Sequence, residues 1–413
     1  MRQQRRTWRV VAASLALSPV SVSPSRAAEL KPYGFVLVNA IEHWNRPSIL
    51  DIPTQASSTD DPDTRDTYNA FHARQTRVGL TAKGIDSPGG SQASATVEMD
   101  FWGNRAAGTP GNDVLQAGPR LRLAFIQLQW ERHGVLLGQD WVKAFSPLNP
   151  ASLMHQAIPA MHNSGNLWNR IPQLRWDGRF EPSNRGTALN AKFALARAFS
   201  ADQSGRTTAG VAAANQTDQP GSGETSGGPA YQALLEAVRK IDGREFIVGV
   251  SGQYLRQKFR PGVVAGPAGA PSGTTGGALV ALHAVLPMHA VFELSGEGFF
   301  GRSDMALQGL GQIYADGTLI RTSQTRGGWV QATFKPAPPW KVNLIEGGEK
   351  VDETGLAIGK PYRNETLMAN VIWDGSKGLS VSAEYGMIRT YFAGRAAGRA
   401  HNLGLAAMCK FGG

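Results

Sequence analysis

Short segments of alternating apolar and polar residues follow one another along most of this 413-residue chain. In residues 95–102, for example, Val97 and Met99 alternate with Glu98 and Asp100. Successive side chains of a β-strand point to opposite faces of its sheet, so each segment is predicted to be a strand with one apolar and one polar face. Most segments are close to the ~10 residues that a tilted strand needs to cross the hydrocarbon layer of a membrane.

The connections between the segments alternate between tight turns, such as Asp242-Gly243, and long loops, such as 200–229. Alternate connections of an up-and-down barrel lie at opposite mouths, so we expect short periplasmic turns and long extracellular loops. The predicted fold class is therefore all-β, a closed antiparallel transmembrane β-barrel of about sixteen strands. The predicted strands are 33–44, 73–84, 93–103, 119–131, 134–142, 171–181, 187–199, 230–241, 245–256, 277–287, 289–301, 327–336, 339–347, 364–375, 378–391 and 398–411.

Residues 1–27 have the pattern of a secretory signal peptide. Met1–Arg9 carries four arginines and no acid, a modest apolar stretch follows, and Ser25-Arg26-Ala27 places small residues at positions −3 and −1 of a cleavage site. We expect cleavage after Ala27, which leaves residues 28–413 as one barrel domain. The Arg5-Arg6 pair also fits the export route for folded proteins, although an ordinary basic leader is the favoured interpretation.

The composition excludes several classes of protein. The single cysteine, Cys409, rules out a disulfide framework and a cysteine-cluster metal site, and alternation places it on the outer face of the last strand. The formal charge of +10 falls to +5 without the leader's five arginines, a basic bias too weak to imply nucleic-acid binding but compatible with a lumen that prefers anions. His155 and His162 have no ligand-rich neighbours, so we expect neither a metal nor a cofactor.

A series of short motifs occurs in order across the first third of the expected mature chain. The motifs are YGFVLVNAI (33–41), RVGL (77–80), EMDFWG (98–103), RLRLA (120–124), GQDW (138–141) and RIPQLRW (170–176). In order and spacing the series resembles the strands of trimeric Gram-negative porins, most of all the DcaP-like outer-membrane porins. Beyond it, the strand rhythm and Phe411 continue the resemblance. The long helical segment that some DcaP-like members carry before the first strand is absent here.

The resemblance implies a homotrimer of sixteen-stranded barrels in the Gram-negative outer membrane, which passes small hydrophilic solutes such as carboxylates. It also implies that the third long loop, Lys143–Arg170, folds into the lumen and narrows it. Phe411 matches the terminal aromatic residue that the barrel-assembly machinery recognises, although Gly412-Gly413 follows it here.

Strand parity and the third loop together predict the residues that line the pore or its constriction. Opposed charges across a constriction order water and favour polar solutes, and an excess of arginine over acid favours anions. The alternative is that these charges only pair with one another and solvate the wall. The predicted residues are Arg77, Glu98, Asp100, Arg120, Arg122, Lys143, His155, His162, Arg175, Asp177, Arg179, Lys192 and Glu384.

The leading functional hypothesis is a passive diffusion channel without enzymatic activity, whose partners are the outer-membrane bilayer, further copies of the chain, the assembly machinery and the solute. An outer-membrane barrel enzyme of lipase or protease type needs a nucleophile, a histidine and an orienting group in register. The serines and histidines here do not line up on one strand rim. A secreted β-sandwich or adhesin would leave the extensive apolar face unexplained.

Overall fold

The computed structural model describes residues 28–85, 87–103, 117–183, 186–199, 221–259, 272–302, 304–375 and 377–412. The predicted signal peptide, Gly413 and much of the long loops 103–118, 200–229 and 257–276 lie outside these residues. No helix in the described part of the chain is long and apolar enough to span a membrane.

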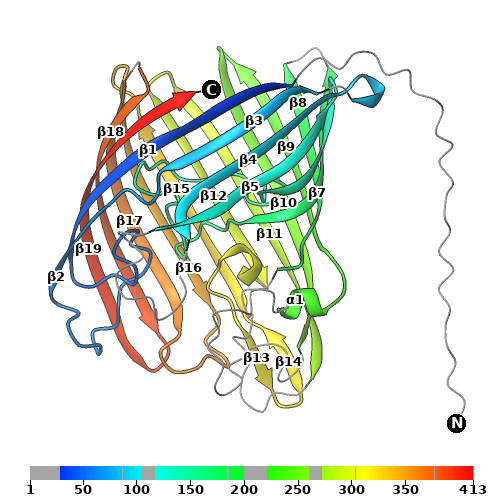
Figure 1. Cartoon of the computed structure of the whole chain (residues 1–413). Helices are drawn as coiled ribbons and strands as arrows, with labels where there is room; N and C mark the ends of the chain where they lie inside the picture. The colour runs from blue at the N-terminus through cyan, green and yellow to red at the C-terminus, as the bar shows by residue number, and fades with distance from the viewer. Residues whose placement is uncertain are drawn as a thin grey trace, which may run out of the picture.

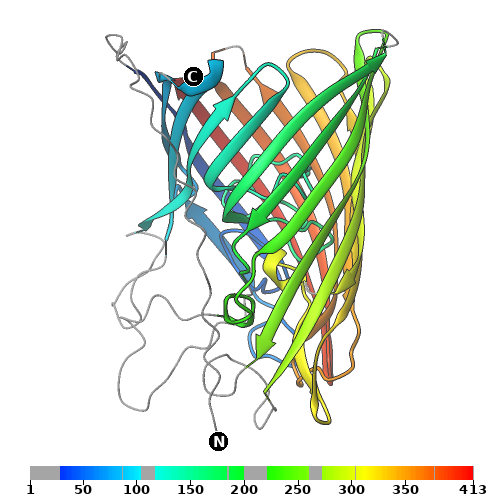
Figure 2. The same ribbon diagram turned by 90° about the vertical axis from the view of Figure 1, so that its right-hand side faces the viewer.

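The described chain forms one closed antiparallel barrel, because the last strand pairs with the first (Figures 1 and 2). Its wall strands are β1 (Glu29–Trp44), β2 (Thr67–His72), β3 (Arg77–Ile85), β4 (Gln92–Gly103), β5 (Gly118–Gln129), β6 (His133–Trp141), β7 (Arg170–Ser183), β8 (Thr187–Ala196), β9 (Ala230–Ile241), β10 (Arg244–Phe259), β11 (Gly273–His289), β12 (Phe292–Arg302), β15 (Gln324–Phe334), β16 (Trp340–Val351), β17 (Pro361–Asp374), β18 (Leu379–Phe392) and β19 (Arg395–Gly412).

Of the 17 strands in this sheet, β2 and β3 both pair with β1 and share one position in the wall. The barrel therefore has about sixteen strand positions, as the sequence predicts. One difference is the break between β2 and β3, where a continuous strand over 73–84 was expected. There the Leu37 N–H donates to the Thr76 hydroxyl at 3.1 Å, so a side chain replaces a ladder hydrogen bond.

The connections differ from the expected pattern at one mouth of the barrel. The loop after β12 contains a short helical turn (Asp304–Leu307) and the hairpin β13 (Ile313–Asp316) and β14 (Leu319–Thr322), which projects at the long-loop mouth (Figure 1). At the same mouth β18 and β19 are joined only by Ala393 and Gly394. The alternation of tight and long connections therefore ends before the last one. A second short helix, α1 (Ser222–Thr225), lies beside β10.

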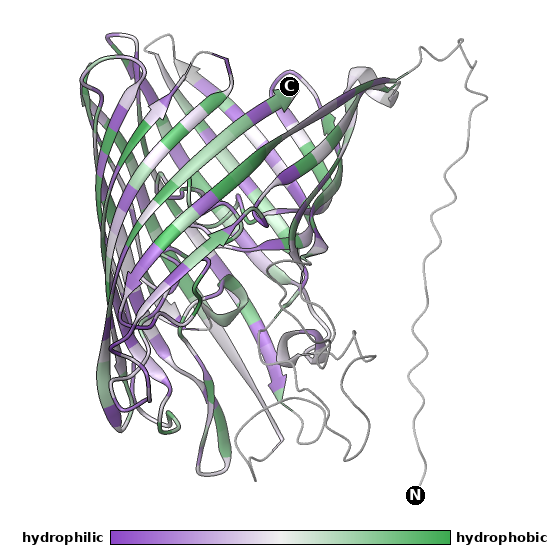
Figure 3. Cartoon of the chain, turned by 60° about the vertical axis from the view of Figure 1, so that its left-hand side comes forward, coloured by the Kyte–Doolittle hydropathy of each residue, from purple (hydrophilic) through white to green (hydrophobic). Residues whose placement is uncertain are grey.

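Side chains alternate between an apolar outer face and a polar inner face, and bands of opposite hydropathy follow along the strands (Figure 3). In β19, Leu403 and Leu405 are 46% and 58% exposed, whereas Asn402 and Ala406 are 3% and 2% exposed. Cys409 is exposed on the same face as the two leucines, as predicted. An exposed apolar wall around a filled interior is the arrangement that lipid requires.

The seam that closes the barrel places the last aromatic residue against a glycine. Phe411 is opposite Gly34 in the β1–β19 ladder, and a Cβ on Gly34 would lie only 2.8 Å from Cζ of the Phe411 ring. The missing side chain makes room for the ring on the outer face. The role of Phe411 as an assembly signal stays a prediction.

Replacing Leu405 with arginine is expected to lower the free energy of unfolding by about 2–4 kcal/mol, because the leucine lies near the middle of β19 on the outer face. Urea titration of protein folded into lipid vesicles measures this change. Leu319→Arg is the matched control, because Leu319 is 54% exposed but lies on β14, outside the wall. Equal stability of the two variants would contradict the assignment of the outer face to lipid.

Candidate functional site

The third long connection, residues 142–169, lies inside the barrel and is hydrogen-bonded to strands on several sides (Figure 2). The Ser146 hydroxyl and the Leu148 N–H donate to Glu297 of β12 at 2.5 and 2.8 Å. The Ser152 hydroxyl donates to Glu384 of β18 at 2.6 Å. These buried carboxylates hold the segment, called the inner loop below, across the lumen.

Apolar contacts also fasten the inner loop to the wall. Phe145 and Leu167 are fully buried and pack with Leu255, Leu279 and Phe299 of β10–β12. On the other side of the lumen, the inner loop approaches β16 so closely that only a glycine fits at position 347. A Cβ on Gly347 would lie 2.3 Å from the carbonyl oxygen of Ser164. This segment therefore fills part of the cross-section of the lumen.

The first long loop, residues 45–66, covers the inner face of β17–β19 towards the long-loop mouth. The Asn364 amide donates to the Thr54 carbonyl oxygen at 2.9 Å, and the Ala56 N–H donates to the Thr390 hydroxyl at 2.8 Å. Ile52 of this loop packs with Trp102 and with Ala157 of the inner loop. Two loops therefore shape the entrance on this side.

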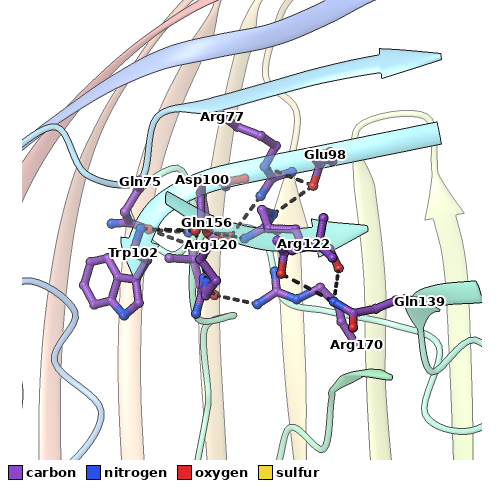
Figure 4. A network of polar contacts seen from close by, with 12 residues as sticks. Gln75, Arg77, Glu98, Asp100, Trp102, Arg120, Arg122, Gln139, Gln156 and Arg170 are labelled. Carbon is purple, nitrogen blue, oxygen red and sulfur yellow. Dashed lines mark hydrogen bonds and ion pairs between the residues drawn. The ribbon is translucent and has the colours of Figure 1, made fainter. Parts of the chain in front are cut away.

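Four arginines gather around two carboxylates where the inner loop faces β3–β5 (Figure 4). The arginines are Arg77 of β3, Arg120 and Arg122 of β5 and Arg170 at the start of β7, and the carboxylates are Glu98 and Asp100 of β4. We call these six residues the arginine cluster. The alternation of β4 and β5 turns these residues inward, and the ladder pairs Asp100 with both Arg77 and Arg120.

The two carboxylates are saturated by the arginines. Arg120 binds Asp100 through two contacts, with Nε–Oδ1 at 3.0 Å and Nη2–Oδ2 at 2.6 Å. Arg122 bridges both acids, with Nε 2.8 Å from Glu98 Oε1 and Nη1 2.7 Å from Asp100 Oδ2. Arg77 Nε lies 3.4 Å from Glu98 Oε1. With four guanidinium groups and two carboxylates, the arginine cluster carries an excess of positive charge.

The remaining positive charge is the accessible part of the arginine cluster. The side chains of Glu98 and Asp100 are only 5% and 0% exposed, whereas those of Arg77 and Arg120 are 17% and 29% exposed. Guanidinium groups rather than carboxylates are therefore the accessible charges on this part of the inner wall. Arg122 is fully buried, so its guanidinium group is not accessible from the lumen.

The inner loop is oriented so that its backbone carbonyl groups point at the arginine cluster. Gln75, in the break between β2 and β3, accepts from the N–H groups of Gln156 and Ala157 at 2.8 Å. Arg77 donates to the Gln156 carbonyl oxygen at 3.0 Å, and Arg120 donates to that of Ala157 at 3.2 Å. The break between β2 and β3 therefore leaves the Gln75 side chain available to bind the inner loop.

Replacing Arg122 with methionine is expected to lower the free energy of unfolding by about 3–5 kcal/mol, because it leaves two buried carboxylates without their bridging cation. The transition from folded to unfolded mobility on gels, followed against urea, measures the loss. Arg179→Met is the matched control, because Arg179 is 53% exposed and its partner Glu181 is 62% exposed. An unchanged transition for Arg122→Met would show that the pairs do not stabilise the wall.

A second set of charged residues lies on β6–β8, the strands that follow the arginine cluster along the wall. Arg175 is within 2.8 Å of Asp140 and 3.1 Å of Asp177, and Lys192 is 3.2 Å from Asp177. These partly buried residues form a continuous ladder of opposite charges. Arg179 and Glu181 continue it as an exposed pair.

The remaining predicted site residues belong to the inner loop or contact it. Lys143 donates to the Pro147 carbonyl oxygen at 3.2 Å, and His155 Nε2 lies 3.3 Å from Glu384. Burial lowers the pKa of His162 to about 4, so its neutral ring accepts the Trp168 indole N–H at 3.0 Å. These contacts give the histidines and Glu384 a role in holding the loop, and their pore-lining role stays a prediction. No cluster of metal-binding side chains occurs among the described residues.

Arg170 was not predicted as a site residue. Alternation in β7 turns Pro172 and Leu174 outward, so extrapolation by two places puts Arg170 outward as well. Instead its guanidinium group lies 4.9 Å from the ring centre of Trp141 and 5.3 Å from that of Trp168. The nearby tryptophans were the available signal, since arginine stacks on aromatic faces.

Among known proteins, only solved structures are similar to this chain. No protein-family model matches the chain, and no curated protein matches it. The outer membrane channel DcaP of Acinetobacter baumannii superposes with a TM-score of 0.65 at 17% identity, over 93% of this chain and 98% of that one. The chain has the fold of an outer-membrane porin.

Two further porins agree with this assignment. The anion-selective porin from Comamonas acidovorans gives a TM-score of 0.58 at 14% identity, over 93% of this chain and 100% of that one. OprB of Pseudomonas putida gives 0.53 at 11% identity, over 93% and 94%. The expected resemblance to DcaP-like porins is confirmed at the level of the porin fold.

Proposed function

We propose that the chain is an outer-membrane porin, a passive channel for small hydrophilic solutes that prefers anions such as small carboxylates, and that it is not an enzyme. The observation that carries the proposal is the difference in exposure within the arginine cluster. Glu98 and Asp100 are covered, while Arg77 and Arg120 remain accessible beside the inner loop. Positively charged groups lining a narrow passage favour anions.

The porin fold supports the rest of the assignment. The exposed apolar wall suits a Gram-negative outer membrane, which the chain would reach through the periplasm with the help of the barrel-assembly machinery. A homotrimer is proposed by analogy with porins of this fold. The anion-selective Comamonas acidovorans porin supports the proposed preference.

Recording from purified protein in planar lipid bilayers tests the proposal. We expect stepwise openings, and a reversal potential across a potassium chloride gradient that favours chloride. Raising the salt should weaken the preference, since the screening length falls from about 10 Å at 0.1 M to about 3 Å at 1 M. Absence of openings would reject the channel, and a preference for potassium would reject the anion selectivity alone.

A further inference from the structure

Two guanidinium groups of the arginine cluster each have a buried N–H donor that no described residue accepts. Arg122 Nη2 and Arg170 Nη1 are both buried, and neither has a hydrogen-bond partner among the residues that the structure describes. Both groups lie beside one aromatic ring, with their central carbons 5.9 and 4.9 Å from the ring centre of Trp141. A buried donor without an acceptor is destabilising, and more so on a charged group, so these donors call for a ligand.

Shared partners hold the two guanidinium groups close to one point of the arginine cluster. Arg122 Nη1 and Arg120 Nη2 bind the same oxygen of Asp100, Oδ2, at 2.7 and 2.6 Å. Arg120 Nη2 and Arg170 Nη2 in turn donate to the same carbonyl oxygen of the inner loop, that of Ala157, at 3.2 and 3.3 Å (Figure 4). Three like charges therefore meet around two acceptor atoms, which leaves the outer donors of Arg122 and Arg170 unused.

The carboxylates of the arginine cluster are already occupied by other donors. Asp100 Oδ1 accepts from the Trp102 N–H at 3.1 Å and from Arg120 Nε at 3.0 Å, while Oδ2 binds two guanidinium groups. Glu98 Oε1 accepts from Arg122 Nε at 2.8 Å. A shift of either carboxylate towards the free donors would break these contacts, so the missing acceptor has to come from outside the chain.

The local charge favours an anion over a water molecule as this acceptor. Within the six residues of the arginine cluster, four guanidinium groups face two carboxylates, so two positive charges are not compensated. Lys143 adds another cation, with Nζ 6.0 Å from the ring centre of Trp141, and the neighbouring acid Asp140 is bound to Arg175 at 2.8 Å. Water would satisfy the hydrogen bonds but leave the buried charge, whereas an anion satisfies both.

We propose that the arginine cluster holds a resident monatomic anion of the halide class, such as chloride, which accepts from Arg122 Nη2 and Arg170 Nη1 beside Trp141. The complete burial of the Arg122 side chain favours a small ion with a single charge, because a doubly charged phosphate or sulfate costs more to desolvate. The ion is part of the folded wall and is distinct from any solute that passes through the lumen. The inference therefore does not depend on the proposed channel function.

Anomalous X-ray diffraction locates the ion directly when the full chain is folded from urea and crystallised in sodium bromide. We expect a bromide peak in contact with Arg122 Nη2 and Arg170 Nη1. Arg170→Met should lose this peak. Arg179→Met should keep it, because Arg179 is exposed and paired with Glu181. Bromide at other positions alone would show adventitious ions only and would overturn the proposal.

The dependence of stability on halide concentration gives a second readout, measured by urea titration in lipid vesicles. A ligand that binds only the folded state raises the ratio of folded to unfolded protein in proportion to its concentration above the dissociation constant. In that range, a tenfold rise in sodium chloride, with sodium gluconate keeping the ionic strength constant, should raise this ratio by about tenfold. Arg170→Met should remove the dependence. An equal dependence in wild type and variant would contradict a site at this arginine.

Comparison of bromide binding with conductance separates this inference from the proposed function. A wild-type barrel that conducts but holds no bromide at the arginine cluster rejects only the resident ion. A barrel that holds bromide there but shows no openings rejects only the channel.

Discussion

Replacing Arg77 and Arg120 together by glutamate is expected to convert the proposed anion preference of the channel into a preference for cations. The wild-type wall exposes two guanidinium groups at this level while its carboxylates are covered. The substitutions exchange these accessible cations for anions, so the potential in the narrow part of the lumen changes sign. The sign of the reversal potential in a potassium chloride gradient reports the change directly.

Two further variants make this result specific. Arg77→Gln with Arg120→Gln removes the charge without adding repulsion to Asp100, and it should bring the reversal potential towards zero. Arg179→Glu is the control, because Arg179 is exposed and paired with Glu181 away from the inner loop. A larger effect of Arg179→Glu than of the double variant would place selectivity at that end of the wall and contradict the assignment.

Removal of the two carboxylates that hold the inner loop should widen the channel. Glu297 accepts from Ser146 and Leu148, and Glu384 accepts from Ser152. Each of these three hydrogen bonds contributes about 0.5–3 kcal/mol, depending on the charge of its acceptor, so Glu297→Ala with Glu384→Ala withdraws a few kcal/mol from the loop. We expect a higher and less uniform single-channel conductance, together with entry of larger sugars in liposome-swelling assays.

The conservative pair Glu297→Gln and Glu384→Gln separates loop anchoring from charge. Glutamine at 297 keeps a carbonyl oxygen for the Leu148 N–H, and its NH2 group can donate to the Ser146 hydroxyl, while glutamine at 384 keeps a carbonyl oxygen for Ser152. The conductance of this pair should therefore stay close to that of the wild type. Glu365→Ala, on the outer face beside Arg363, is the control for loss of a carboxylate elsewhere. If the alanine pair conducts like the control, the apolar contacts of Phe145 and Leu167 are sufficient to hold the loop.

The wall of the barrel could be predicted because its information is local. In β4, the alternation of Val97 and Met99 with Glu98 and Asp100 indicates both a strand and the face that each residue occupies. The same argument placed Arg120 and Arg122 inside and Cys409 outside. It did not reach Arg170, which lies one residue before the predicted strand 171–181.

The position of the inner loop could not be predicted, because the residues that bind it are remote in the chain. Ser146 meets Glu297 across 151 residues, and Ser152 meets Glu384 across 232. Parity indicates that both acids face inward, but it does not say that a loop covers them. Gln75 was likewise hidden inside an expected continuous strand, and only the break between β2 and β3 reveals why it is free to bind the inner loop.

Sequence alone determined the fold class of this protein, the approximate number of strand positions in its wall and the two faces of that wall, because strand pleating repeats every two residues. Tertiary structure decided which of the inward charges a solute can reach. The ladder of β3, β4 and β5 places three arginines around two carboxylates, Arg170 joins them from the start of β7, and the acids end less exposed than Arg77 and Arg120. Exposure depends on what packs across the lumen, and that is a property of the closed barrel rather than of any segment.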